Sequence, residues 1–167
     1  MPPKYEPCTA IEWRTITGPT PGARAFLAEV LAHYGAGPTN QSGVGSDGIY
    51  NHRMVRGSRT AHSNHASGRA IDVHVSDNGP GRLVGYDLFQ RITRDPAATA
   101  VGVCEAIYYR QRWDGTSNLV KPYLGHPDDH KTHVHVTMTA DVAHHPCDPT
   151  NPADPLRVWF RHFLFEV

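Results

Sequence analysis

Two short segments of alternating apolar and polar residues constrain the fold of this chain more than any other feature. Residues 69–75 read RAIDVHV and residues 132–138 read THVHVTM, so each segment carries apolar side chains at every second position. Because successive side chains of a strand point to opposite faces, this pattern predicts two half-buried β-strands. If the strands pair in one sheet, Asp72 and His135 face the same cavity, and the apolar side chains are buried on the other face.

Residues outside these strands predict helices and one further strand. Residues 21–34 carry apolar side chains at helical spacing, with Pro21 near the start and Gly35 after the end. The other expected elements, in chain order, are turn-forming residues at 35–48, a helix over 85–95 ending at Pro96, a strand within 103–113, and a last helix that Asp154 and Pro155 begin.

Length and charge limit the class of protein. The 167 residues match one domain, and we expect residues 1–167 to form a single α+β domain, with a small antiparallel sheet and helices packed behind it and at its ends. Lys plus Arg and Asp plus Glu both number 16, so no basic field attracts nucleic acid or an anionic membrane. No apolar run approaches the roughly 20 residues that span a bilayer. We therefore expect no binding of nucleic acid and no insertion into membranes. We also expect a monomer.

The N-terminus and the cysteines bear on the compartment. Residues 1–10 lack the apolar stretch of a signal peptide, so we expect any role outside the cell to depend on another protein or on a longer chain. The cysteines Cys8, Cys104 and Cys147 are odd in number and widely spaced, which predicts at least one free thiol. We expect Cys104 to be a small buried hydrophobe, and a Cys8–Cys147 bridge remains open.

Histidines gather in two stretches of the chain. The sequence has 12 histidines, ten of which lie within residues 52–74 and 126–145. His65 precedes Asp72 by seven residues, and Gly68 between them allows the chain to turn back, so His65, Asp72 and His135 can meet at one point. Catalytic zinc sites use three nitrogen or oxygen ligands and keep one open position. His62 is the rival ligand, His74 is either a partner of a ligand or solvent-facing, and His144 and His145 are expected to be exposed.

Residues 63–72 carry a family resemblance. They read SNHASGRAID and match the pattern S-x-H-x-x-G-x-A-x-D at every fixed position, with His133 to His135 as a second motif. The chain thus resembles the zinc peptidases of the D-Ala-D-Ala carboxypeptidase, lysostaphin-type and hedgehog-like superfamily, above all the D-Ala-D-Ala carboxypeptidase and extensin-like branches. The resemblance implies that fold, with one Zn²⁺ per chain held by His65, Asp72 and His135 on the polar face of the sheet.

The resemblance also implies residues that act on a substrate. Arg53, in the run YNHR, and Ser63 would contact a carboxylate or carbonyl of a peptidoglycan stem peptide. Alternatively, Arg53 is an ordinary surface charge or pairs with an acidic residue of the chain, and Ser63 only caps the turn before His65. Many carboxypeptidase members carry a glutamate base where this chain has Thr132. His133 is therefore expected to be the base, and Asp128 and Asp129 are the alternatives.

These residues predict a zinc metallopeptidase that hydrolyses peptide bonds in peptidoglycan, with an endopeptidase favoured over a D,D-carboxypeptidase. A phage endolysin domain, or part of a longer exported chain, fits the lack of a signal peptide. Two alternatives stay open. A non-haem Fe(II) oxygenase uses the same ligand set, and a non-catalytic zinc-stabilised module would bind a cell wall or a protein.

Overall fold

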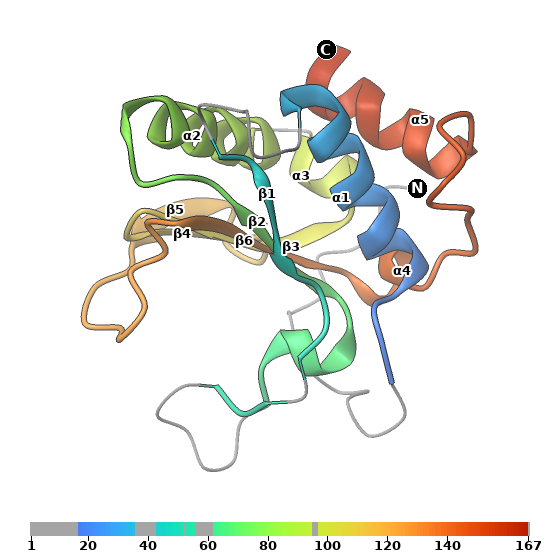
Figure 1. Cartoon of the computed structure of the whole chain (residues 1–167). Coiled ribbons are helices and arrows are strands. Elements are labelled where there is room, and N and C mark those ends of the chain that lie inside the picture. The colour runs from blue at the N-terminus through green and yellow to red at the C-terminus, as the bar shows by residue number, and fades with distance from the viewer. Residues whose placement is uncertain (1–16, 36–42, 52, 56–61, 95–96, 167) are drawn as a thin grey trace.

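The computed structural model describes residues 17–35, 43–51, 53–55, 62–94 and 97–166. They form an α+β fold around one six-stranded antiparallel sheet, with the strand order β1-β2-β6-β3-β4-β5 (Figure 1). The strands are β1 (Gly45–Gly48), β2 (Ala70–His74), β3 (Val103–Tyr108), β4 (Gln111–Asp114), β5 (Leu119–Pro122) and β6 (His133–Met138). The expected α+β class with a small antiparallel sheet is confirmed.

The helices lie mainly on one side of the sheet, as Figure 1 shows. They are α1 (Pro21–Tyr34), α2 (Gly79–Thr93), α3 (Ala97–Ala100), α4 (Ala140–Ala143) and α5 (Pro155–Arg161), which continues as a π-helical turn over His162–Glu166. A short 3-10 helix (Asn64–Ser67) precedes β2 on the opposite side of the sheet. Among the described residues, none of the helices combines the length and hydropathy needed to cross a bilayer.

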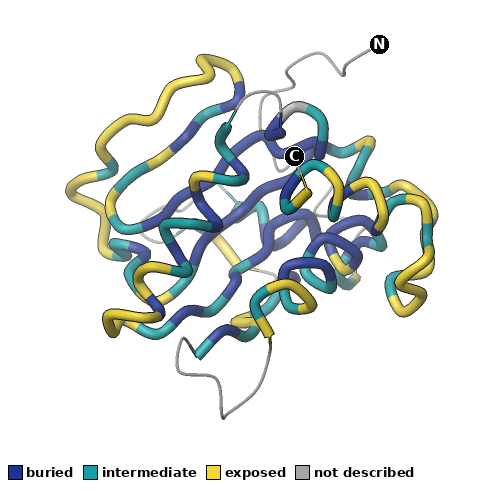
Figure 2. Tube along the Cα trace, turned by 90° about the horizontal axis from the view of Figure 1, so that it is seen from above, coloured by how far each residue is buried: buried dark blue, intermediate teal, exposed yellow. Residues whose placement is uncertain are grey.

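The two alternating segments pair as the sequence predicts. β2 and β6 are antiparallel neighbours, and Asp72 lies directly opposite His135. The apolar side chains of both strands, Ile71, Val73, Val134, Val136 and Met138, are fully buried in the core. Figure 2 shows this burial along the central strands, with exposed residues in the outer loops. The helices therefore cover the apolar face and leave the polar face for the histidines.

A buried ionic cluster joins the first and last helices. Glu29 of α1, only 2% exposed, accepts from Arg157 Nε at 2.6 Å and from Arg161 Nε at 2.9 Å, both of α5. Phe26 and Phe160 pack edge to face beside it, with ring centroids 5.6 Å apart. α1 matches its expected bounds and α5 begins at the expected residue, where the Asp154 side chain caps it by accepting from Leu156 N.

Several elements differ from the sequence expectation, and among them α3 and α4 are short helices that the sequence analysis does not predict. α2 begins at Gly79 instead of residue 85, because the Asn78 side chain caps it by accepting from Gly81 N at 2.7 Å. The strand expected within 103–113 is a hairpin, since Tyr109 and Arg110 take positive φ values of 45° and 64° and reverse the chain. β1 forms inside residues 35–48, which had been predicted as turns, and β5 was not predicted.

The cysteine expectations are corrected in part. Cys147 carries a free thiol, so a Cys8–Cys147 bridge is absent. Cys104 is buried as expected but is disulfide-bonded, so it is not a free thiol acting as a small hydrophobe. Cys8 itself lies outside the described residues.

Candidate metal centre

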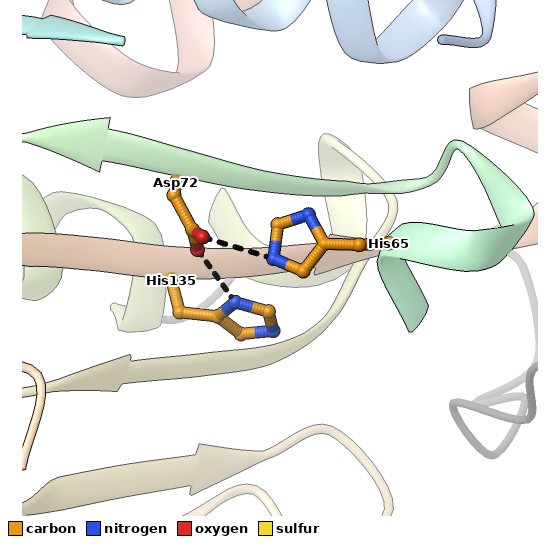
Figure 3. A group of neighbouring side chains, drawn as sticks. All are labelled: His65, Asp72 and His135. Carbon is orange, nitrogen blue, oxygen red and sulfur yellow. Dashed lines mark hydrogen bonds and ion pairs between the residues drawn. The ribbon is translucent and has the colours of Figure 1, made fainter. Parts of the chain in front are cut away.

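Three side chains predicted as ligands meet on the polar face of the sheet (Figure 3). His65 Nε2 lies 3.0 Å from Asp72 Oδ2, and His135 Nδ1 lies 2.8 Å from Asp72 Oδ1. His65 and His135 are buried, and the Asp72 side chain is 14% exposed. Each oxygen of the Asp72 carboxylate thus lies next to one ring nitrogen. Each of the three residues has an atom that could bind a shared metal ion.

The turn before β2 brings His65 back to Asp72. Ser63 Oγ caps the 3-10 helix by accepting from His65 N at 3.3 Å. Gly68 ends it with φ of 67°, a left-handed conformation that costs glycine no steric strain. Thr20 donates through both its backbone nitrogen and its hydroxyl to the Gly68 carbonyl, which ties this turn to the start of α1. The capping contact places Ser63 in a structural role at the site.

Hydrogen bonding fixes the tautomer of His65. Its Nδ1 lies 3.0 Å from the Ile49 carbonyl oxygen, which can only accept, so Nδ1 carries the proton. The neutral ring then presents the lone pair of Nε2 to Asp72. Nε2 is buried and makes no hydrogen bond within the described part of the chain, although a carboxylate oxygen lies 3.0 Å away. Two facing lone pairs repel unless a cation lies between them, so this contact calls for a positive charge.

A chain of polar contacts fixes His135 in the same way. The Thr137 hydroxyl donates to Glu105 Oε1 at 3.5 Å, so the Thr137 oxygen accepts from His135 Nε2 at 3.2 Å. Glu105 is held in turn by Arg112, whose Nε lies 2.7 Å from Oε2. The proton of His135 therefore sits on Nε2, and Nδ1 presents a lone pair to Asp72. Ligand histidines in metalloproteins are typically oriented by such a hydrogen bond from the other ring nitrogen.

The donor set fits a metal ion. Two bare imidazole nitrogens and one carboxylate converge, and a single divalent cation satisfies all three. On a tetrahedral ion with bonds of about 2.0 to 2.1 Å, neighbouring ligand atoms lie about 3.3 Å apart. The distances of 2.8 and 3.0 Å need only a few tenths of an ångström of expansion. This cluster could therefore hold a metal ion with little rearrangement.

Electrostatics at the centre follow from these contacts. Burial alone would raise the pKa of Asp72, but whenever the His135 and His65 rings carry a second proton, their hydrogen bonds and positive charge lower it well below its usual range. Burial alone would lower the pKa of His135, yet Asp72 and Glu105 raise it, while the charge of Arg53 opposes that rise. Arg53 is exposed, and its carbonyl oxygen accepts from Ser63 N at 3.0 Å. Its charge therefore acts on His135 from the surface.

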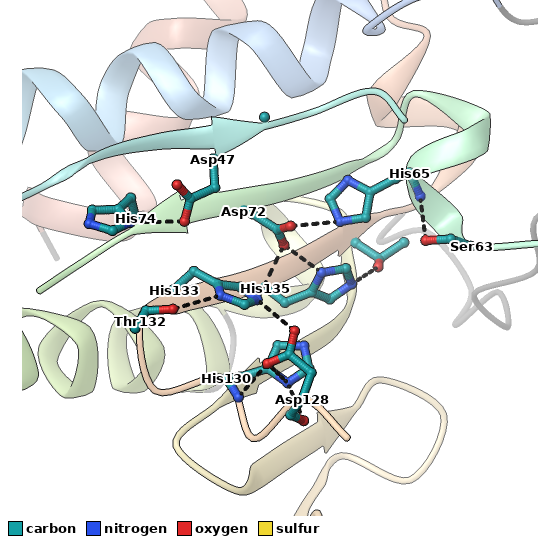
Figure 4. A network of polar contacts seen from close by, with 12 residues as sticks. Asp47, Ser63, His65, Asp72, His74, Asp128, His130, Thr132, His133 and His135 are labelled. Atoms are coloured by element: carbon teal, nitrogen blue, oxygen red, sulfur yellow. Dashed lines mark hydrogen bonds and ion pairs between the residues drawn. The ribbon is translucent and has the colours of Figure 1, made fainter. Parts of the chain in front are cut away.

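A second group of donors lies beside the first (Figure 4). His133 Nε2 is 3.9 Å from Asp72 Oδ1 and 4.0 Å from Asp128 Oδ2. The hydroxyl of Thr132 lies 3.5 Å from His133 Nδ1. The Nε2 atom of His133 therefore faces two carboxylates beside the group of His65, Asp72 and His135.

Sequence reasoning assigned no role to His130, which the structure places in this second group. Its ring lies 4.7 Å from that of His133 and 5.8 Å from that of His135, measured between centroids. Burial, reinforced by the charges of His133 and His135, lowers the pKa of His130 to about 4, so it is neutral near pH 7. Its position three residues before His133, in the same cluster of histidines, was the available signal.

The remaining candidates lie elsewhere. His62 forms an isolated bridge with Met54 and belongs to neither group of possible ligands. His74 of β2 pairs with Asp47 of β1 at 2.9 Å in a half-exposed contact. Asp129 is bound by Lys131 at 2.9 Å and Arg110 at 3.3 Å, so Asp128 is the loop carboxylate that faces His133. His145 is exposed as expected, and His144 is half-buried.

Comparison with models of protein families, with curated proteins and with solved structures yields no match to this chain.

Proposed function

We propose that the protein is a zinc-dependent peptidase that hydrolyses peptide bonds of peptidoglycan. The observation that carries the proposal is the convergence of two bare, buried imidazole nitrogens on the two oxygens of Asp72. The motif of residues 63–72 supports the substrate class, because it matches the pattern of zinc peptidases that act on cell walls. On this proposal the α+β fold is of the hedgehog and D-Ala-D-Ala peptidase type.

Each residue of the centre has a separate task. His65, Asp72 and His135 would hold the zinc ion, which when bound supplies a Lewis acid that polarises a carbonyl and acidifies water. His133 accepts the proton from the attacking water through Nε2, since that nitrogen faces the centre and lies 3.9 Å from Asp72 Oδ1. His133 then returns the proton to the leaving amine. Asp128, 4.0 Å from the same nitrogen, stabilises the charged ring between these two transfers.

Arg53 is proposed to bind the substrate at the rim of the centre. It is exposed, yet its charge reaches His135. A guanidinium in this place can hold a carboxylate by two parallel hydrogen bonds or can stabilise a developing oxyanion. We favour an endopeptidase that cuts stems or cross-links, because cleavage within the wall releases tension that trimming of chain ends leaves in place.

Digestion of purified peptidoglycan tests the function. Zinc-loaded protein should release stem or cross-link fragments with new peptide termini, identified by mass spectrometry. His133→Ala should retain one zinc ion and lose roughly 10²- to 10⁴-fold in rate, the usual effect of removing a general acid or base. His65→Ala should lose both the metal and the activity. The exposed His145→Ala is the matched control and should behave as wild type.

Three results would contradict the proposal. Intact peptidoglycan after prolonged incubation with fully zinc-loaded protein would favour a non-catalytic binding module. Retention of zinc in His65→Ala together with loss in His62→Ala would refute the ligand set. A phenotype seen in Asp128→Ala or Asp129→Ala, with full activity in His133→Ala, would move the role of the base to the loop carboxylate.

A further inference from the structure

Asp128, His130 and His133 form a second cluster of metal-ligating side chains next to the first. Each offers one ligand atom, and these atoms lie within 4.8 Å of one another. The group contains one carboxylate and two imidazoles, the same donor types as His65, Asp72 and His135. We infer that it is a second, weaker metal site, and that occupation of this site inhibits the enzyme. The inhibitory part of this inference rests on the proposed function.

Two members of the cluster are held in place before any ion binds. His130 is only 8% exposed, and its backbone is fixed on both sides, because Tyr109 N donates to its carbonyl and its own amide donates to Asp128 Oδ1 at 3.0 Å. His133 lies on β6, whose position is set by pairing with β2 and β3. The third member, Asp128, has a side chain that is 41% exposed and can adjust.

The distances explain why this site should be weaker than the first. Asp128 Oδ2 lies 4.0 Å from His133 Nε2. His130 Nδ1 donates to the Asp128 carbonyl oxygen at 3.2 Å, so the nitrogen of His130 left to bind a metal is Nε2. Ligand atoms on a tetrahedral zinc ion are about 3.3 Å apart, so the cluster must contract where the first centre needs only a slight expansion. Ordering the half-exposed Asp128 costs further free energy. We expect binding to be about tenfold or more weaker than at the first centre.

Asp72 makes it feasible for both sites to be filled together. Its Oδ1 lies 2.8 Å from His135 Nδ1 and 3.9 Å from His133 Nε2, so the carboxylate stands between the two clusters and screens the charge of one ion from the other. The second ion would occupy the lone pair of His133 Nε2. That nitrogen could then no longer accept a proton from water, so excess metal should reduce the rate of hydrolysis.

Metal titration of the whole metal-free protein tests the second site directly. Calorimetry with Zn²⁺, and absorption spectroscopy with Co²⁺ as a coloured probe, should each give one tight and one weaker ion per chain. Asp128→Asn keeps the oxygen that caps the His130 amide but removes the charge, and should weaken the second site tenfold or more. His130→Ala should abolish that site, and His145→Ala, which removes an exposed histidine elsewhere, should retain both ions.

The outcomes separate this inference from the proposed function. Saturation of wild type at one ion that Asp72→Asn removes would overturn the second site and leave the function standing. A weak ion retained in both Asp128→Asn and His130→Ala would also overturn it. A single tight ion lost in His130→Ala but kept in Asp72→Asn would refute the proposed catalytic ligands instead. In activity assays, inhibition by excess zinc should require at least tenfold more zinc in Asp128→Asn than in wild type, and an unchanged midpoint would contradict the inhibitory role.

Discussion

Substitution of Thr137 by valine tests whether the polar chain behind His135 serves metal binding. Valine keeps the shape of threonine but removes the hydroxyl that accepts from His135 Nε2 and donates to Glu105. Thr137 is fully buried, so no bulk water replaces the lost partner. The folded protein should persist, because the apolar packing of β6 stays the same.

The size of the effect follows from the tautomer that each state requires. In the metal-free protein, His135 can move its proton to Nδ1 and donate to Asp72 Oδ1, which lies 2.8 Å away. With a metal on Nδ1, the proton must stay on Nε2, where the variant offers it no hydroxyl. A buried unsatisfied donor costs about 1 to 3 kcal/mol, and this cost falls mainly on the metal-bound state. Metal affinity should therefore drop roughly 10- to 100-fold, a range also typical of losing a hydrogen-bond partner of a ligating histidine.

Thr139→Val is the matched control, two residues further along the chain. Thr139 is also buried, but its Oγ1 makes no hydrogen bond among the described residues. Competition with a chromophoric chelator measures the zinc affinity of both variants and of Thr137→Ser, which restores the hydroxyl. Affinity within twofold of wild type for Thr137→Val, or an equal loss in Thr139→Val, would refute the role of the polar chain.

Three further predictions concern stability and substrate binding. For protein held at a free zinc concentration 100 times the Kd, removal of the metal by a chelator should lower the free energy of unfolding by about 2.7 kcal/mol. An unchanged thermal denaturation curve would show that the native protein binds no ion. Glu29→Ala should lower the free energy of unfolding in urea by roughly 3 to 5 kcal/mol, because it leaves the buried Arg157 without its carboxylate. The control Arg82→Ala, which removes an exposed ion pair, should change this free energy little. Arg53→Lys should impair cleavage of a stem peptide with a free C-terminus if the guanidinium holds that carboxylate. Complete loss of wild-type activity on the same peptide with an amidated C-terminus would show a carboxypeptidase instead of the expected endopeptidase.

The alternation of residues 69–75 and 132–138 was enough to predict the paired strands and the meeting of Asp72 with His135, because burial of one sheet face fixes which side chains share the other. The contacts that orient the ring nitrogens were beyond such reasoning. The Ile49 carbonyl is a backbone atom with no sequence signature, and Glu105 lies on β3, where every residue is buried and no alternation marks a polar face. β1 is short and contains two glycines, so its sequence resembles a turn, and only pairing with β2 makes it a strand.

If the proposed centre binds a metal ion, the register of β6 against β2 makes metal loading a measure of correct folding. A slip of one residue between these strands would set a valine opposite Asp72 and turn His135 toward the helices. A slip of two residues would keep the alternation but place His133 or Thr137 opposite Asp72. In either case His135 would lie away from Asp72 and from its neighbours on β3. Only chains with the native register present His65, Asp72 and His135 together. The fraction of a preparation that binds the tight ion therefore counts the molecules whose central strands are aligned, which bulk secondary-structure signals cannot distinguish from slipped ones.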